Sequence, residues 1–156
     1  MLFRSSSAKR VMSLKDGSKK MSKSDASDMA RINLTDCADD ILKKFRKATS
    51  DSYEGISYDV ENRPEASNLL TIFAALSDRE IGEVAAEYAN SGFAEFKKDL
   101  ADLAVEKLSP ITQEYNKIKS DRAELEKIAA TGRQKAAEIA QAKICKVKDV
   151  LGLNNG

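Results

Sequence analysis

Two lysines near the start of this 156-residue chain have the surroundings of a phosphate-binding cluster. Lys20 and Lys23 are three residues apart, and no carboxylate lies between Lys19 and Ser24 to neutralise them. One hydroxyl group stands between the two lysines and another follows them. Such a set of cations and donors suits the phosphates of a nucleotide, where catalysis consists mostly of holding charge in place. By composition alone, a solvated linker of lysine and serine is the simpler interpretation.

The order of the residues, rather than their composition, favours a specific site. Residues 20–24 read Lys-Met-Ser-Lys-Ser, which is the second signature of class I aminoacyl-tRNA synthetases. The surrounding segments resemble the bacterial-type tryptophanyl-tRNA synthetases of that class. These segments are 10–14 (RVMSL), 19–25 (KKMSKSD), 43–51 (KKFRKATSD), 67–70 (SNLL), 101–106 (ADLAVE) and 147–152 (VKDVLG). The resemblance runs through residues 10–153 and covers only the C-terminal part of the family's enzymes, from the signature loop onward.

The resemblance implies a tryptophan–tRNA ligase, with ATP and its Mg²⁺ counter-ion as the cofactor. In this family the tryptophan carboxylate attacks the α-phosphorus of ATP, and pyrophosphate leaves. Lys20 and Lys23 would be the catalytic cations that face the pyrophosphate, with Lys23 the more important. Because negative charge builds on the leaving group, such cations stabilise the transition state more than the ground state. No residue of the chain is implied as a metal ligand.

The rest of the loop is assigned to ATP by the same resemblance. The implied ATP-binding residues are Val11, Lys20, Met21, Ser22, Lys23 and Ser24. Ser22 and Ser24 would donate hydrogen bonds to phosphate or fix the loop, while Val11 and Met21 would lie against the adenine. From chemistry alone, Val11 and Met21 fit an apolar contact with the domain nearly as well. Gly17 would give the loop the freedom to open and close.

The chain lacks the sequence features of the family's catalytic half. It contains no histidine, whereas the first class I signature requires two. It also has no Gly-x-Gly-x-x-Gly motif and no alternation of apolar strands with helices that would build a doubly wound sheet. The resemblance therefore implies one side of an ATP site, inactive alone. The implied partners are tRNA(Trp), the N-terminal catalytic half or a full-length subunit, and tryptophan bound through that half. We expect no membrane or DNA partner.

Composition and charge indicate an all-α protein with a basic N-terminal arm. Apolar residues make up 42% of the chain and charged residues 33%, without tryptophan, proportions that suit helices. The net charge of +1 conceals an asymmetry, because residues 1–23 hold seven lysines and arginines against the single carboxylate of Asp16. A basic arm on a mildly acidic body indicates a local anion site rather than a general nucleic-acid surface.

We expect two parts: a nucleotide-binding loop arm at residues 1–30 and a C-terminal helical domain of the tRNA anticodon-binding type at residues 31–156. The arm has few apolar residues to bury, so we expect it to be mobile without its partner half. The helical part should form an irregular bundle that lacks the Rossmann half of the family. Its basic face at residues 133–148 is the best candidate for contacts with tRNA phosphates.

Helix signals predict five or six helices. The predicted boundaries are a cap at Asp36, a start at Pro64, a capping box at Ser77 and Glu80, a kink or split at Pro110, a start at Ser120 with Asp121 and Glu124, and a break at Gly132. The helix from Pro64 should be the most buried, and the basic face of the first helix should be solvated. Leu125 and Ile128 should point inward.

Three polar residues are interpreted as structural. Asn68 should be a satisfied polar group near a helix start. Cys37 and Cys145 lie far apart and in no metal-binding spacing, so we expect reduced, half-buried thiols.

Two other functions stay open at this stage. The chain could be a non-enzymatic helical module that binds RNA or protein, or it could belong with the tyrosyl relatives, which share the loop motif. The bacterial-type resemblance implies a cytoplasmic location. The alternative is the mitochondrial matrix, because residues 1–14 contain arginine and serine but no acid, as a transit peptide does.

Overall fold

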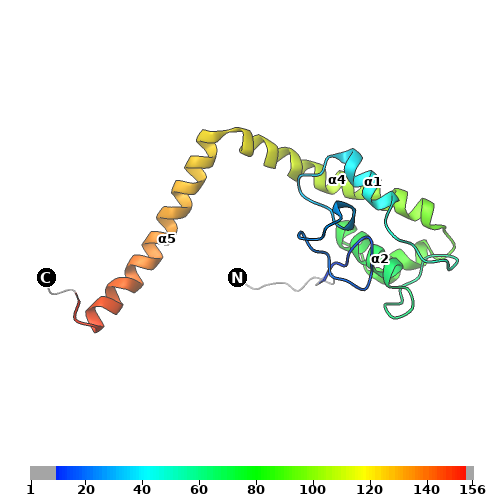
Figure 1. The fold of residues 1–156 in the computed structure, drawn as a ribbon, viewed down its shortest axis with the longest axis horizontal. Coiled ribbons are helices and arrows are strands. Elements are labelled where there is room, and N and C mark those ends of the chain that lie inside the picture. Colours follow the sequence, from blue (N-terminus) through cyan, green and yellow to red (C-terminus); the bar gives the residue numbers. More distant parts are fainter. Residues whose placement is uncertain (1–9, 154–156) are drawn as a thin grey trace. The chain divides into compact units, whose positions relative to one another are not determined.

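The computed structural model describes residues 10–153, and this part of the chain is helical (Figure 1). Its elements are η1 (Asp28–Ala30), α1 (Ala38–Arg46), α2 (Pro64–Ser77), α3 (Ile81–Glu87), α4 (Phe93–Ser120) and α5 (Arg122–Val150). Strand-like pairing among residues 10–153 is limited to one isolated antiparallel bridge, between Met12 and Lys20. The prediction of an all-α chain without a Rossmann half is confirmed. The start of the predicted arm, before residue 10, lies outside the described residues.

The chain separates after Gln113 into two compact units, and the core of the first is built around α2. This helix begins at Pro64, as predicted, where the missing proline N–H costs no hydrogen bond. Phe73 of α2, Tyr88 after α3 and Phe96 of α4 pack ring against ring. The centroid distances are 5.5 Å for Phe73–Tyr88, 5.7 Å for Phe73–Phe96 and 4.9 Å for Tyr88–Phe96. The helix from Pro64 is thus deeply buried, as its sequence predicts.

The helix α1 packs its apolar stripe on this core, but its start and its basic face differ from the prediction. Ile41 and Phe45 are buried, as predicted. Asp36 does not cap the helix, because Cys37 occupies the N-cap position and the Asp36 carboxylate binds the ammonium of Lys44 instead. Lys44 is only 3% exposed, so the basic face is not uniformly solvated. A buried lysine is tolerated here because carboxylates neutralise it.

The connection between α1 and α2 is fixed by Arg63, the residue before α2. Its guanidinium donates to both carboxylate oxygens of Asp51, at 3.0 and 2.8 Å, and to the carbonyl of Gly55 at 2.9 Å. Burial raises the pKa of Asp51, but the hydrogen bonds from Arg63 and from the amide of Tyr53, together with the charge of Arg63, hold that pKa below its usual range. Gly55 has a φ of 66°, and a Cβ there would stand 1.9 Å from the carbonyl oxygen of Ala89. Only glycine therefore fits this turn.

The helices α4 and α5 are more continuous than predicted. Helix α4 runs through Pro110 without splitting, and α5 runs through Gly132 without a break. A glycine costs a helix only about 1 kcal/mol relative to alanine, too little to end a long one. Asp121 caps α5, as predicted, by accepting the amide three residues further on at 3.0 Å. Leu125 and Ile128 are 42% and 49% exposed, so the prediction that they point inward is wrong.

Two smaller predictions are also wrong. Ser77 belongs to the end of α2 and donates its hydroxyl to the carbonyl of Phe73, while Glu80 is the N-cap residue of α3 and makes no side-chain cap bond. The predicted capping box is therefore absent. Cys37 and Cys145 are free thiols, as predicted, but both are exposed rather than half-buried. No helix of the described residues is long and apolar enough to cross a membrane.

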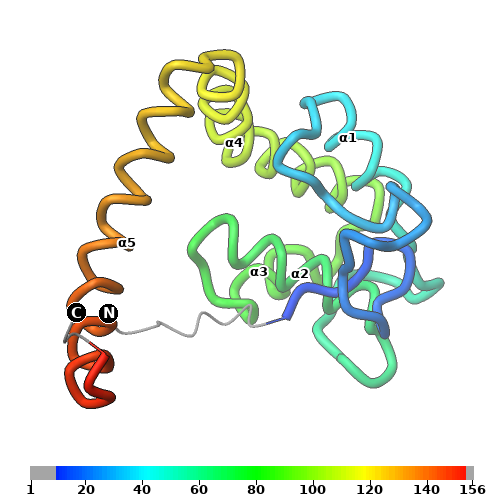
Figure 2. The backbone as a smooth tube through the Cα atoms, turned by 60° about the vertical axis from the view of Figure 1, so that its left-hand side comes forward, coloured from blue at the N-terminus to red at the C-terminus, as the bar shows by residue number. Residues whose placement is uncertain are grey.

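Residues 11–21 form a short hairpin that packs on α2 (Figure 2). Asn68 of α2 makes the contact, and its side chain is 5% exposed. Its amide oxygen accepts the backbone N–H of Met12 at 2.9 Å, and its amide nitrogen donates to the carbonyl of Met12 at 3.0 Å. The side chain of Asn68 thus satisfies both backbone groups of Met12, as the backbone of a neighbouring strand would. The prediction that Asn68 is a satisfied polar group is confirmed.

The turn of the hairpin also lies against α2. Gly17 is buried, and a Cβ there would stand 2.5 Å from the carbonyl carbon of Pro64 and 2.6 Å from the amide nitrogen of Glu65. Leu14 is 2% exposed, and its carbonyl accepts the amide of Thr49 at 2.8 Å. This packing contradicts the expectation that the arm has little to bury. Glycine at position 17 serves a close approach to α2, a role that the sequence did not reveal.

We predict that Gly17→Ala destabilises the protein by about 1–3 kcal/mol, the usual cost of forcing an extra methyl group into a packed contact. The matched control is Gly82→Ala in α3, where a Cβ would meet nothing within 4 Å. That substitution should stabilise the helix by up to about 1 kcal/mol. Denaturant unfolding of both variants measures the difference. Equal effects of the two substitutions would contradict the close contact at Gly17.

Candidate nucleotide-binding loop

The hairpin sets the register of the loop that carries the two candidate lysines. The amide of Met21 donates to the carbonyl of Val11 at 3.0 Å, and the amide of Ser13 donates to the carbonyl of Lys19 at 2.7 Å. Val11 and Met21, both predicted to contact adenine, are therefore neighbours on paired segments. Both are half-buried, and Met21 packs against the core of the first unit. The domain contact that the sequence also allowed is thus observed for Met21.

The first lysine of the basic run is neutralised within the hairpin turn. The carboxylate of Asp16 accepts the amide of Ser18 at 3.0 Å, and it forms an ion pair with Lys19 at 2.8 Å. The hydrogen bond from Lys19, with those from Ser18, lowers the pKa of Asp16 to about 2. The same pairing raises the pKa of Lys19. Lys19 therefore has a carboxylate partner within its own turn, although the pair is exposed to solvent.

Lys20 and Lys23 are exposed like Lys19, but they differ from it because neither pairs with a carboxylate in the described part of the chain. The hydroxyls of Ser22 and Ser24 lie 2.9 Å apart, and the amide of Ser24 donates to the Ser22 hydroxyl at 3.3 Å. The structure therefore brings the two serines together in a tight turn at the loop tip. Two exposed ammonium groups beside two hydroxyls form a donor set that fits phosphate oxygens.

Sequence reasoning missed the residues that hold this loop in place. Asn68 and Gly17 fix the hairpin, as described above, and Arg31 binds the far end of the loop by donating to the carbonyl of Asp25 at 2.9 Å. Asn68 is a polar residue within the apolar run of α2, and this position could have indicated that it binds another segment of the chain. Arg31 gave no such signal, because its contacts depend on how the chain turns after the loop.

A cavity of about 610 Å³ lies elsewhere in the first unit, between α1 and α4. Its lining consists of Leu42, Arg46, Ser50, Phe93, Ala94, Lys97, Lys98, Ala101 and Asp102. Three of these residues are cationic. Asp102 is the anionic residue of the lining, and it pairs with Lys98 at 3.8 Å. The rest of the wall is mainly apolar and includes an aromatic ring. The cavity therefore combines an apolar surface with an excess of positive charge.

Lys97 is the buried member of this cationic set. It is 8% exposed, and its ammonium donates to the carbonyl of Ala48 and to the hydroxyl of Ser50. The ammonium also lies 5.6 Å from the centroid of the Phe93 ring. Burial lowers the pKa of Lys97. Unlike Lys44, this lysine has only neutral partners among the described residues, so its charge adds to the positive potential of the cavity.

The chain was compared with protein families, curated proteins and solved structures. The sequence model of the family "tRNA synthetases class I (W and Y)" matches residues 3–109. The tryptophan–tRNA ligase of Mesorhizobium japonicum is 48% identical over 152 residues, which cover 96% of this chain and 42% of that protein. The tryptophan–tRNA ligase of Rickettsia conorii is 46% identical over 143 residues, covering 92% of this chain and 43% of that protein.

A solved structure shows the same architecture. The tryptophanyl-tRNA synthetase of Mycoplasma pneumoniae superposes with a TM-score of 0.78 at 27% sequence identity, covering 94% of this chain and 46% of that one. This chain thus spans less than half the length of the relatives that it matches. The predicted resemblance to the C-terminal part of bacterial-type tryptophanyl-tRNA synthetases is confirmed. The chain belongs to the class I tRNA synthetase family of the tryptophan and tyrosine enzymes.

Proposed function

We propose that this chain supplies the signature-loop side of the ATP site in a tryptophan–tRNA ligase. The observation that carries the proposal is the pair of exposed lysines, Lys20 and Lys23, without carboxylate partners in the described residues, beside the hydroxyls of Ser22 and Ser24. The curated relatives with the matching sequence are tryptophan–tRNA ligases, so tryptophan is the proposed amino acid rather than tyrosine. A bacterial-type cytoplasm is the proposed location, with the mitochondrial matrix as the alternative.

The proposed chemistry is electrostatic. When the tryptophan carboxylate attacks the α-phosphorus of ATP, negative charge moves onto the departing pyrophosphate. Lys20 and Lys23 would lie against that charge, and the hydroxyls of Ser22 and Ser24 would donate hydrogen bonds to phosphate or hold the turn. Val11 and Met21 would offer the adenine ring an apolar contact. The loop needs no general base, because the attacking carboxylate is already ionised at neutral pH.

Mg²⁺ would accompany ATP as its counter-ion. Residues 10–153 contain no group of three histidine, cysteine or acidic side chains placed to hold a metal ion. Within this chain's share of the site, the phosphates themselves would therefore carry the metal, and the lysines would complement its charge. The proposed parts of the chain remain the loop arm at residues 1–30 and the helical tRNA-binding domain at residues 31–156.

Lys23→Ala should lower kcat for tryptophan activation by about two to three orders of magnitude, the range for removing one preorganised donor. The Kd for ATP should change much less, because the contact strengthens only as charge develops. The assay joins this chain to the N-terminal half of a tryptophan–tRNA ligase and follows ATP–pyrophosphate exchange. Lys15→Ala is the control, since Lys15 is exposed and lies outside the motif. If Lys15→Ala and Lys23→Ala have equal effects, the transition-state role is wrong.

The cavity between α1 and α4 supports a second part of the proposal, contact with tRNA. Its cations Arg46, Lys97 and Lys98 would attract a phosphate, and the ring of Phe93 offers a stacking surface to an unstacked base. Bases in the single-stranded loops of tRNA are accessible for such contacts. This cavity is a stronger candidate than the face at residues 133–148, which the sequence favoured, because it combines positive charge with an apolar wall.

We expect Arg46→Ala and Lys98→Ala each to weaken binding of tRNA(Trp) and to reduce the salt slope of log Kd by about 1, as the loss of a phosphate contact does. Lys143→Ala on α5 is the matched control and should leave the slope unchanged. Filter binding at several salt concentrations measures all three with the isolated chain. If Lys143→Ala instead weakens tRNA binding more than Arg46→Ala and Lys98→Ala do, the RNA contact lies on the face at residues 133–148 and not at the cavity.

A further inference from the structure

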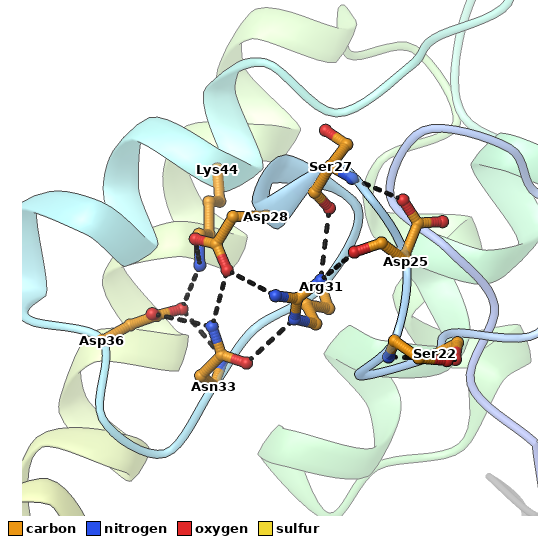
Figure 3. Close-up of polar contacts among 9 residues, drawn as sticks. Ser22, Asp25, Ser27, Asp28, Arg31, Asn33, Asp36 and Lys44 are labelled. Carbon is orange, nitrogen blue, oxygen red and sulfur yellow. Dashed lines mark hydrogen bonds and ion pairs between the residues drawn. The ribbon is translucent and has the colours of Figure 1, made fainter.

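We propose that Arg31 is a positioning residue for Lys23, because it fastens the end of the signature loop to α1. This inference rests on the proposed role of Lys23 at the pyrophosphate. Figure 3 shows Arg31 between the loop residue Asp25 on one side and Asp28 and Asn33 on the other. Its side chain is 17% exposed. No feature of the signature motif itself includes this arginine.

The three nitrogens of the Arg31 guanidinium point in different directions and bind four groups. The longest of these bonds joins a terminal nitrogen to the carbonyl of Ser27 at 3.4 Å. One terminal nitrogen donates to the carbonyl of Asp25 at 2.9 Å, the other pairs with the carboxylate of Asp28 at 3.0 Å, and Nε donates to the side-chain oxygen of Asn33 at 3.1 Å. The fork of the guanidinium holds these donors in fixed relative positions. A lysine at this position would present a single ammonium and could not reproduce all three directions.

The network continues from Asp28 into the core. The second carboxylate oxygen of Asp28 pairs with the ammonium of Lys44 at 2.7 Å, and Lys44 also pairs with Asp36 at 2.5 Å (Figure 3). Hydrogen bonds from Lys44 and Asn33 lower the pKa of Asp28. Lys44 belongs to α1 and is almost fully buried, so its place is set by the packing of that helix. The end of the loop is therefore tied to a rigid element through Arg31 and Asp28.

Charge balance explains why a cation is needed at position 31. Lys44 alone supplies one positive charge to the two carboxylates of Asp28 and Asp36. Arg31 supplies the second, so the four groups are neutral together. Loss of Arg31 would leave one uncompensated negative charge close to the loop and would release the carbonyl of Asp25. Both changes would disturb a cation placed two residues earlier.

The loop tip between Met21 and Asp25 is consequently held at both ends. At its start, Lys20 pairs with Met12, whose backbone is bound by Asn68 of α2. At its end, the amide of Asp25 donates to the carbonyl of Ser22 at 3.3 Å, and Arg31 holds the carbonyl of Asp25. Lys20 thus depends on an anchor in α2, whereas Lys23 depends on an anchor in α1.

A double-mutant cycle tests this inference in the enzyme assembled from this chain and the N-terminal half of a tryptophan–tRNA ligase. Arg31→Gln should lower kcat for activation about tenfold or more, with little change in the Kd for ATP, since small misplacements of a catalytic group cost that much. In the Lys23→Ala background, the same substitution should have almost no further effect. Arg79→Gln is the control, because it removes an exposed arginine whose partner is Glu87.

The outcomes separate this inference from the proposed function. If Lys23→Ala leaves kcat unchanged, the proposed function of the loop fails, and the positioning role fails with it. If Lys23→Ala lowers kcat but Arg31→Gln lowers it by the same factor in both backgrounds, only the positioning role is overturned. If Arg31→Gln lowers kcat only when Lys23 is present, the two effects are coupled and the positioning role of Arg31 is supported.

A second readout uses the isolated chain and needs no catalysis. NMR relaxation of the amide nitrogens of Ser24 and Asp25 should show increased motion in Arg31→Gln, while Lys20 stays ordered. Asp28→Asn removes the ion pairs that join Arg31 to Lys44. Because the Asp28 side chain is 58% exposed, this substitution disturbs the fold less, and it serves as the second variant if Arg31→Gln does not fold. Unchanged relaxation at Ser24 and Asp25 in a folded variant would overturn the anchoring by Arg31.

Discussion

The position of the loop depends first on the buried amide of Asn68. A two-stranded hairpin without a sheet beside it is marginally stable in water, and the hairpin at residues 11–21 has no further strand to pair with among residues 10–153. The side chain of Asn68 replaces that strand by bonding both backbone groups of Met12. Leaving such a buried amide unpaired would cost about 1–3 kcal/mol. The hairpin and α2 therefore stabilise each other. The orientation of the signature loop is set by its attachment to α2, the most buried helix.

Charge pairing then distinguishes the two candidate lysines from the others nearby. Lys19 pairs with Asp16 in the turn, and Lys44 is buried against two carboxylates. Lys20 and Lys23 stay exposed, without an acidic partner in the described residues. Lys15 is exposed as well, but it lies outside the signature, so the lack of an acidic partner and the motif together single out Lys20 and Lys23. This contrast is the physical reason to assign the pyrophosphate to Lys20 and Lys23.

The sequence predicted what depends on local pattern, and it failed where contacts join distant segments. The buried helix from Pro64 and the cap at Asp121 follow from turn and helix chemistry, and both are confirmed. Three features depend on residues that are distant in the sequence, so no local sequence pattern indicated them. They are the burial of Lys44, the close contact of Gly17 with α2, and the hydrogen bond from Arg31 to the carbonyl of Asp25. The residue type and position of Asp36 suit a helix cap. In the structure its carboxylate instead accepts a hydrogen bond from the buried ammonium of Lys44.

The measurement that tests the central claim most directly is complementation of tryptophan-dependent ATP–pyrophosphate exchange. The N-terminal half of a tryptophan–tRNA ligase, this chain alone and their equimolar mixture are assayed side by side. We predict exchange in the mixture only, and none when residues 20–24 of this chain are replaced by Gly-Ser linker, because the signature loop supplies the cations for the leaving group. Equal exchange by the mixture with and without the loop sequence would contradict the account.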